Sequence, residues 1–346
     1  MFLVAAVGFQ PPHAVRKELP ADTATFASAS QVCRMLRDRT AFLLLPIHKK
    51  MREEFIPNLK IKPPSGSAFG CETPPMMPKL HQACLVVGPR GAGKTTAVVN
   101  LIERLPFDRI FVISPSIASN KELMKRLKID SQDIYEDPDD ISCLDKIKAS
   151  IEQERDDLER YQQEMKRYRQ LMKVIHSESP LFKLNDQDLG DFFQNGDFQP
   201  PKHKWNGKPP CMCLLIDDAM GSQLYSKPRR LNQFTIFHRH LGQLKEGGAL
   251  GCSLFFLVQS YKAVAGGISR TIRSNATSMI LFANKNLKML TEVSEELAGE
   301  VAPEVFFNVF NQAMRDKHDF LFIDLHRKPN HPSAFRRNLD TFLIPE

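Results

Sequence analysis

No segment of the chain reaches the roughly 18 to 20 consecutive apolar residues that a membrane-spanning helix requires. Residues 1–9 are apolar, but this stretch is short for a targeting signal and has no basic residue before it. We therefore expect a strand or an anchoring segment there, and no membrane partner.

Cysteine is also scarce, with seven in 346 residues. That number excludes a disulfide-dense secreted scaffold and favours the interior of a cell. Cys211 and Cys213 alternate within an apolar run, so both side chains should point to one face of a strand. We expect buried, reduced thiols, because a metal site would need further ligands nearby.

The charges nearly balance, since 47 Lys and Arg residues oppose 40 Asp and Glu residues, giving a net charge of +7. That excess is compatible with nucleic-acid binding but does not identify it. Apolar residues make up 42% of the chain, which is normal for a globular protein. A chain dominated by disorder is therefore excluded.

From residue 83 onward, short apolar runs alternate with helical patterns. The runs are continuous, as in strands that are buried on both faces. This alternation predicts an α/β fold with a mainly parallel sheet and helices on both faces. The predicted strands are 83–87, 109–114, 211–216, 253–258, 277–282 and 319–324, and the predicted helices are 229–241, 286–298 and 303–315.

Two flanking regions differ from this central part, which we place at 81–326. Many prolines interrupt residues 1–80, so we expect an irregular N-terminal extension with short helices near 28–38 and 48–55. Residues 327–346 are expected to form a basic C-terminal tail. Its cations, which either contact phosphates or are simply solvated, are Arg327, Lys328, Arg336 and Arg337.

An insertion at about 118–205 interrupts the alternation of strands and helices. Within it, apolar residues recur every three or four positions from Leu144 to Ile175, and only Glu154 breaks the series. This heptad pattern predicts one long helix with an apolar stripe. Packing on the core of the same chain and packing on a neighbouring subunit both stay open.

A phosphate-binding loop follows the first predicted strand. The sequence GPRGAGKT fits G-x-x-x-x-G-K-[ST], the Walker A pattern, between a buried strand and a helix. Glycines let successive backbone N–H groups point at phosphate oxygens, and the helix N-terminus adds partial positive charge. We expect the nucleotide ATP to contact Gly88, Pro89, Arg90, Gly91, Ala92, Gly93, Lys94, Thr95 and Thr96. Lys94 would reach the β- and γ-phosphates, and Thr95 would bind Mg²⁺.

Two carboxylates end the apolar run LLIDD, which fits the Walker B pattern. Asp217 fits the residue that holds Mg²⁺ through water, and Asp218 fits the residue that polarises the attacking water. About 120 residues separate the two motifs, which leaves room for an extra strand. A second acidic residue and an extra strand are typical of additional-strand, RecA-like P-loop ATPases.

A third polar residue follows the run FFLV at 255–258. Gln259 there would lie near the γ-phosphate, where it could bond the lytic water; a solvated amide at a strand end is the alternative.

Three arginines are candidates for a residue that reaches a neighbouring subunit's γ-phosphate. Arg273 comes first and Arg270 second, because both precede the predicted strand 277–282 and should lie near the sheet edge. Arg239, between two histidines, comes third.

The segments GPRGAGKTT, LLIDDA, FHRHLGQ and FFLVQSYKAV…SRTIRSNATSMILF occur in this order over about residues 80–325. Together they resemble the DNA-packaging ATPases of large double-stranded DNA viruses and Polinton-type elements, within the FtsK–HerA superfamily. The long heptad helix departs from that family's compact pattern.

This resemblance implies an ATP-driven motor that moves viral double-stranded DNA into a preformed capsid. It also implies a homo-oligomeric ring, pentameric or hexameric, with capsid or portal-vertex proteins as partners. The compartment would be the host cell, nucleus or cytoplasm, or the virion. The alternatives are a P-loop ATPase of another task, such as virion morphogenesis or DNA unwinding, and a nucleotide-binding scaffold with little hydrolysis. The intact Lys94, Thr95, Asp217 and Asp218 argue against the scaffold.

Overall fold

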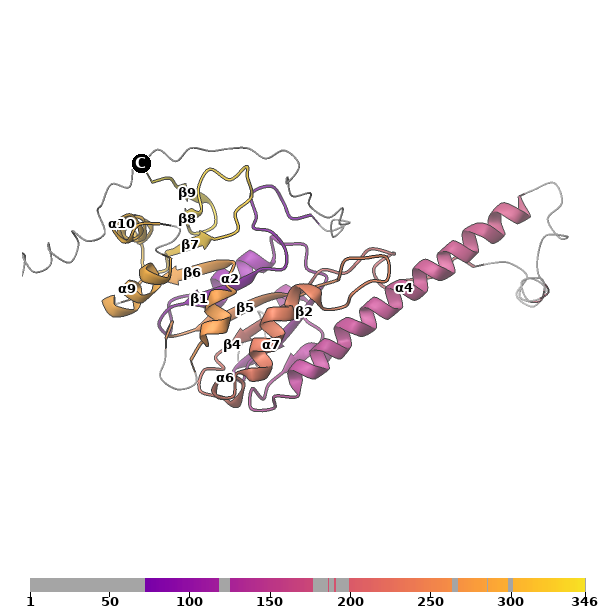
Figure 1. Cartoon of the computed structure of the whole chain (residues 1–346), viewed down its shortest axis with the longest axis horizontal. Helices are drawn as coiled ribbons and strands as arrows, with labels where there is room; N and C mark the ends of the chain where they lie inside the picture. Colours follow the sequence, from indigo (N-terminus) through magenta and orange to yellow (C-terminus); the bar gives the residue numbers. More distant parts are fainter. Residues whose placement is uncertain are drawn as a thin grey trace, which may run out of the picture. The chain divides into compact units, whose positions relative to one another are not determined.

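Figure 1 shows the structure, a computed structural model. It describes residues 72–117, 125–176, 186, 190, 199–262, 267–284, 286–297 and 301–345. They belong to one compact unit, Pro64–Glu346. The short helices expected near 28–38 and 48–55 lie outside the described residues. Within the described part, no helix is both long and apolar enough to cross a bilayer.

One nine-stranded sheet organises the described residues, in the order β3-β2-β4-β5-β1-β6-β7-β8-β9. The pairs from β3 to β6 are parallel, and those from β6 to β9 are antiparallel. All six predicted strands are confirmed to within one residue at each end. The bounds are β1 Ala83–Val87, β2 Arg109–Ile113, β3 Ile134–Tyr135, β4 Met212–Asp217, β5 Ser253–Val258, β6 Ser278–Phe282, β7 Phe320–Asp324, β8 Phe335–Arg337 and β9 Thr341–Leu343.

Helices cover both faces of this sheet, as predicted. In β1, Cys84 and Val86 pack with the buried side of α2, whereas Leu85 and Val87 pack with α4, α7, α9 and α10. Successive strand residues point to opposite faces, so a continuous apolar run supplies both cores. The helices are α2 Lys94–Ile102, α4 Cys143–Ile175, α6 Gln223–Ser226, α7 Arg229–Phe237, α8 Arg270–Ser274, α9 Leu287–Glu296 and α10 Pro303–Ala313, with 3₁₀ turns η3 Ser131–Asp133 and η5 His238–His240.

The insertion contains the expected long helix and also a strand that was not predicted. The strand is β3, whose two residues pair in parallel with β2 at one edge of the sheet. A two-residue strand is too short to produce a periodic signal. The first half of α4 packs on the sheet through Ile147 and Ile151, and its second half continues past the sheet (Figure 1). The first half therefore has the intramolecular role.

Glu154, which breaks the apolar stripe of α4, is the centre of a buried polar cluster. Its Oε1 lies 3.0 Å from Nη1 of Arg109, and its Oε2 accepts a hydrogen bond of 2.6 Å from the Trp205 indole. Arg109 also contacts Asp133 at 2.6 Å and lies over the Phe111 ring. The helix is thus fixed to β2 and η3 through Arg109, and to the loop before β4 through Trp205.

Two sequence expectations are wrong in this part of the molecule. Residues 327–346 are not a solvated tail, because they form β8 and β9 and extend the sheet. Phe335 and Arg336 are both buried in β8, and a charged residue at a buried position gives no apolar run that would predict a strand. Cys211 is disulfide-bonded rather than reduced, whereas Cys213 is a free buried thiol as expected.

Replacing Arg109 with alanine should destabilise the fold by about 3 to 5 kcal/mol, because it removes the ion-pair partner of buried Asp133 and leaves Glu154 with only Trp205 and the more distant Lys204. Asp133 and Glu154 are only 2% and 6% exposed. The control is Arg126→Ala, which breaks an exposed ion pair with Glu103 and should cost less than about 1 kcal/mol. Urea denaturation measures both, and equal losses in the two variants would contradict the cluster's role.

Candidate nucleotide site

The sheet order brings the three predicted motifs to one edge. The strand β5 lies between β1 and β4, with Val87 opposite Val258 and Asp217 opposite Leu257. Because all three strands run parallel, their carboxyl ends meet at the same edge. In the sheet, β5 lies between the strands of the two Walker motifs, and it places Gln259 beside the phosphate-binding loop. In the sequence, the interval between the motifs contains β2 and β3, whereas β5 follows β4.

The phosphate-binding loop has the backbone its glycines permit. Gly91 and Gly93 have φ of +75° and +102°, a region that residues with a Cβ rarely adopt. Gly88 has a different constraint, since a Cβ there would lie 2.8 Å from Cβ of Phe282 in β6. The loop thus turns at two glycines and packs against β6 at the third.

Lys94 spans the inside of this loop. Its Nζ donates hydrogen bonds to the carbonyl oxygens of Gly88 at 2.9 Å and Pro89 at 3.1 Å. Partial burial lowers the pKa of Lys94, and the nearby carboxylates of Asp217 and Asp218 oppose that shift. The ammonium group is therefore held over the loop, where phosphate oxygens would replace the carbonyls as its partners.

Thr95 and Asp217 form the pair expected for a magnesium site. The Thr95 hydroxyl donates to Oδ2 of Asp217 at 2.9 Å. Burial raises the pKa of Asp217, while Thr95 and Lys94 favour its ionised form. A hydroxyl and a carboxylate oxygen fit Mg²⁺, which takes few protein ligands and keeps waters and phosphate oxygens. Among the described residues no cluster of three or more His, Cys, Asp or Glu side chains could hold a metal by itself.

Asp218 and Gln259 face the same cavity as Lys94 and Thr95. Asp218 is exposed and has φ of +54°, so its backbone is held in the left-handed region that non-glycine residues rarely occupy. The backbone N–H of Gln259 is held by the sulfur of Met220 at 3.2 Å. The structure therefore brings the two residues together with the phosphate-binding loop, as the sequence predicted.

The cavity is about 1660 Å³ in volume and extends beyond the phosphate-binding loop. Its far wall comes from segments that sequence reasoning missed: residues 316–320, 338–340 and 342, together with Met76 and Met77. Nδ1 of His318 lies 3.1 Å from the carbonyl oxygen of Ala92, inside the phosphate-binding loop. No motif marks these residues, because only the pairing of β7, β8 and β9 brings them to the loop.

The candidate arginines lie apart from this cavity. Arg273 is held within its own subunit, since its guanidinium contacts Glu296 at 3.2 Å and the carbonyl oxygen of Ile268 at 2.7 Å. Arg270 is exposed, with no ion pair among the described residues. The expected position near a sheet edge is wrong, because β6 is an interior strand and α8 packs on the sheet face through Ile272. Arg239 lies at the opposite end of β1 and lines another cavity.

Comparison with known proteins gives structural similarity alone. No family model and no curated protein matches the sequence. Similar structures include the genome packaging NTPase B204 from Sulfolobus turreted icosahedral virus 2, bound to ATP-gammaS or AMPPCP. These share 13% and 12% identity, cover 75% and 76% of this chain and 98% and 99% of theirs, and have TM-scores of 0.35 and 0.37.

The pCW3 conjugation coupling protein TcpA, in its monomer form with ATPgS, is also similar. It shares 14% identity over 75% of this chain and 61% of its own, with a TM-score of 0.36. Scores this low do not carry an argument about function. The described residues form an α/β P-loop NTPase fold on the strength of the sheet order and the loop geometry.

Substitutions of Asp217 and Asp218 should have different effects on nucleotide binding and on hydrolysis. Asp217→Asn should weaken Mg²⁺-dependent binding of ATP, because it removes the charge that bonds Thr95. Asp218→Asn should keep that binding and lower the hydrolysis rate by about 100-fold or more, since only the proton acceptor is lost. Fluorescent-nucleotide titrations with and without Mg²⁺, and single-turnover rates, measure the two effects. Equal loss of binding in both variants would show that the roles are not divided this way.

Proposed function

We propose that the protein is an ATP-hydrolysing motor that moves viral double-stranded DNA into a preformed capsid. The observation that carries the ATPase proposal is the convergence of Lys94, Thr95, Asp217, Asp218 and Gln259 on one cavity. The motif resemblance over about residues 80–325 supports the packaging task. A ring of five or six copies, contacts with capsid or portal-vertex proteins, and a place in the host cell or virion belong to the same proposal.

In this proposal each residue has a part in hydrolysis. Lys94 and the loop N–H groups bind the β- and γ-phosphates, and Thr95 with Asp217 would hold Mg²⁺, which would neutralise phosphate charge. Asp218 accepts a proton from the attacking water, because its exposed carboxylate lies in the cavity beside the loop. The Gln259 amide orients that water. The strained backbone at Asp218 supports a functional role, since such conformations persist where the surroundings enforce them.

The far wall of the cavity fits the nucleoside. The phosphates occupy the loop end, so the base must lie along the remaining space between α2 and the β8–β9 hairpin. Phe342 lines that space, and one face of its ring lies 4.3 Å from the Arg336 guanidinium. Met77 and Leu339, which pack against the α2 core, add apolar surface. An aromatic ring fixed by a buried cation is a suitable surface for a base.

Between the two arginines of α8, Arg270 is the better candidate for action on a neighbouring subunit. Its side chain is exposed, whereas Arg273 would have to leave Glu296 and the Ile268 carbonyl. Arg270→Ala should therefore keep nucleotide binding and lose activity only in the assembled ring. Full ring activity in this variant would remove Arg270 from the proposal.

The motor proposal is tested by ATP turnover with and without duplex DNA. A motor that grips the phosphate backbone should be stimulated by duplexes of any sequence, and the stimulation should decline as salt rises. Lys94→Ala should abolish turnover, with a loss of at least ~100-fold, because it removes the cation that stabilises the phosphates. If duplex DNA does not change the rate of ATP turnover, the protein is an ATPase with another task. Near-normal turnover of Lys94→Ala would refute the phosphate site.

The nucleoside wall is tested by comparing ATP with inorganic tripolyphosphate. Phe342→Ala should weaken ATP binding by about fivefold or more, since stacking of a base on an aromatic ring contributes about 1 to 3 kcal/mol. Tripolyphosphate binding, which uses the loop alone, should not change. Ile344→Ala is the matched control, because this residue is exposed at the end of the same hairpin and does not line the cavity. If Phe342→Ala weakened the binding of ATP and of tripolyphosphate equally, the base would not bind at this wall.

A further inference from the structure

A second cavity lies at the opposite end of the same strands. It has a volume of about 520 Å³ and is lined by residues before β1, at the start of β6 and at the end of β7. The phosphate-binding loop follows the other end of β1. A five-residue strand is roughly 15 Å long, so the two cavities are separate.

The floor of this second cavity contains an unpartnered amide. Gln82 is 3% exposed, and its Oε1 accepts a hydrogen bond of 3.0 Å from the Ser278 hydroxyl. Its Nε2 has no hydrogen-bond partner in the part of the chain that the structure describes. An unsatisfied buried donor is costly, typically about 1 to 3 kcal/mol. The donor is therefore positioned for an acceptor that enters the cavity.

Three cations line the same cavity and form no ion pair with a carboxylate among the described residues. Lys79 and Arg239 are exposed, and neither forms a salt bridge among the described residues. Nη1 of Arg327 donates to the carbonyl oxygens of His331 at 3.1 Å and Pro332 at 3.5 Å. Many cations elsewhere in the described chain pair with acids, including Arg126, Lys146, Arg230, Lys245 and Lys262.

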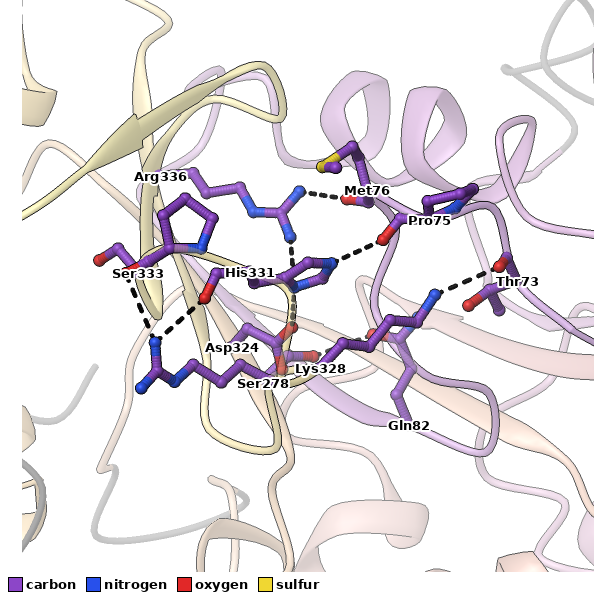
Figure 2. A network of polar contacts seen from close by, with 12 residues as sticks. Thr73, Pro75, Met76, Gln82, Ser278, Asp324, Lys328, His331, Ser333 and Arg336 are labelled. Carbon is purple, nitrogen blue, oxygen red and sulfur yellow. Dashed lines mark hydrogen bonds and ion pairs between the residues drawn. The ribbon is translucent and has the colours of Figure 1, made fainter.

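The one carboxylate among the described residues that line the cavity is Asp324 (Figure 2). It is 3% exposed, and its Oδ2 accepts no hydrogen bond from a described residue; Nδ1 of His331 lies 3.6 Å away but accepts from Arg336 at 3.1 Å. Figure 2 also shows Gln82 and Ser278 joined beside Asp324. The charge of Lys79 acts on Asp324, but Asp324 forms no ion pair with Lys79, Arg239 or Arg327, so three cations line the cavity with one carboxylate.

Burial is the main cause of the pKa shifts beside the cavity, and the surrounding charges add to it. Burial, and after it the charges of His238 and Arg239, lowers the pKa of His81 to about 4. Burial also lowers the pKa of Lys328, while Asp324 and Glu72 oppose that shift and Arg336 and Lys79 add to it. The geometry, an unsatisfied donor and three cations with one carboxylate, fits a tetrahedral oxyanion.

We propose that this cavity binds a phosphate group, with Lys79, Arg239 and Arg327 around the anion and the Gln82 amide beneath it. The phosphate can belong to a DNA backbone or to a free phosphate compound, since both present the same oxygens. The DNA source rests on the proposed function, whereas the phosphate site itself does not.

The test uses the full-length chain with one of three substitutions: Lys79→Ala, Arg239→Ala or Gln82→Met. Each variant also carries Lys94→Ala, so that the nucleotide site does not bind pyrophosphate. Calorimetry measures pyrophosphate binding, and fluorescence anisotropy measures a short duplex DNA over a salt series. Arg126→Ala is the control, because it removes the same charge from an exposed arginine that pairs with Glu103.

If DNA is the source, Lys79→Ala and Arg239→Ala should each weaken duplex binding by about fivefold to tenfold near 0.1 M salt and reduce the salt slope by about 1. If a free phosphate compound is the source, pyrophosphate binding should fall by about tenfold in all three variants while DNA binding matches the control. If all three variants bind pyrophosphate and duplex DNA as tightly as Arg126→Ala does, the proposed site is wrong. If neither the variants nor the control bind DNA, but pyrophosphate binding is reduced in the three variants, the motor proposal is refuted and the phosphate site is supported.

Discussion

The parallel pairing of β4, β5 and β1 is the constraint on which the candidate site depends. These strands are buried on both faces, so a shift of one residue would exchange the two cores as well as the hydrogen bonds. The same register fixes where each strand ends. It sets Asp217 level with the end of β5, and from there Thr95 can reach its carboxylate. The chemistry is thus positioned by apolar packing that contains no functional residue.

A second, polar constraint holds the other wall of the nucleotide cavity. Arg336 is 1% exposed, and its guanidinium donates to the carbonyl oxygen of Met76 and to His331 and lies over the faces of Phe322 and Phe342. Its Nε has no hydrogen-bond partner among the described residues. His331 in turn contacts the carbonyl oxygen of Pro75 at 2.8 Å. The β8–β9 hairpin is therefore fastened to the segment before β1. Because a buried cation is costly without partners, loss of one contact would loosen the whole wall.

Sequence patterns predicted the parts of the molecule that are local. Six continuous apolar runs are the six central strands, and the glycine spacing of 88–93 required the loop that β1 and α2 form. Glu154 was visible only as an interruption, because its partners Arg109 and Trp205 are 45 and 51 residues away. The hairpin was missed for a similar reason. Arg336 belongs to β8 through pairing with Phe322 and Phe342, and its buried guanidinium depends on Met76, which is 260 residues away in the sequence.

The two cavities lie at opposite ends of β1, β6 and β7, so these strands connect one cavity to the other. Phe282, at the end of β6, packs on Gly88 of the phosphate-binding loop, while Ser278, at its start, bonds Gln82 in the second cavity. Phe320 and Asp324, the two ends of β7, likewise line the first and second cavities. Strands held on both sides are stiff, so they can fix the distance between two phosphate groups but cannot switch by themselves. In the proposed motor, any step must therefore come from elements outside these strands. The N-terminal end of α2 and the segments that carry Lys79, Arg239 and Arg327 are the parts that would contact phosphate and that lie outside the sheet.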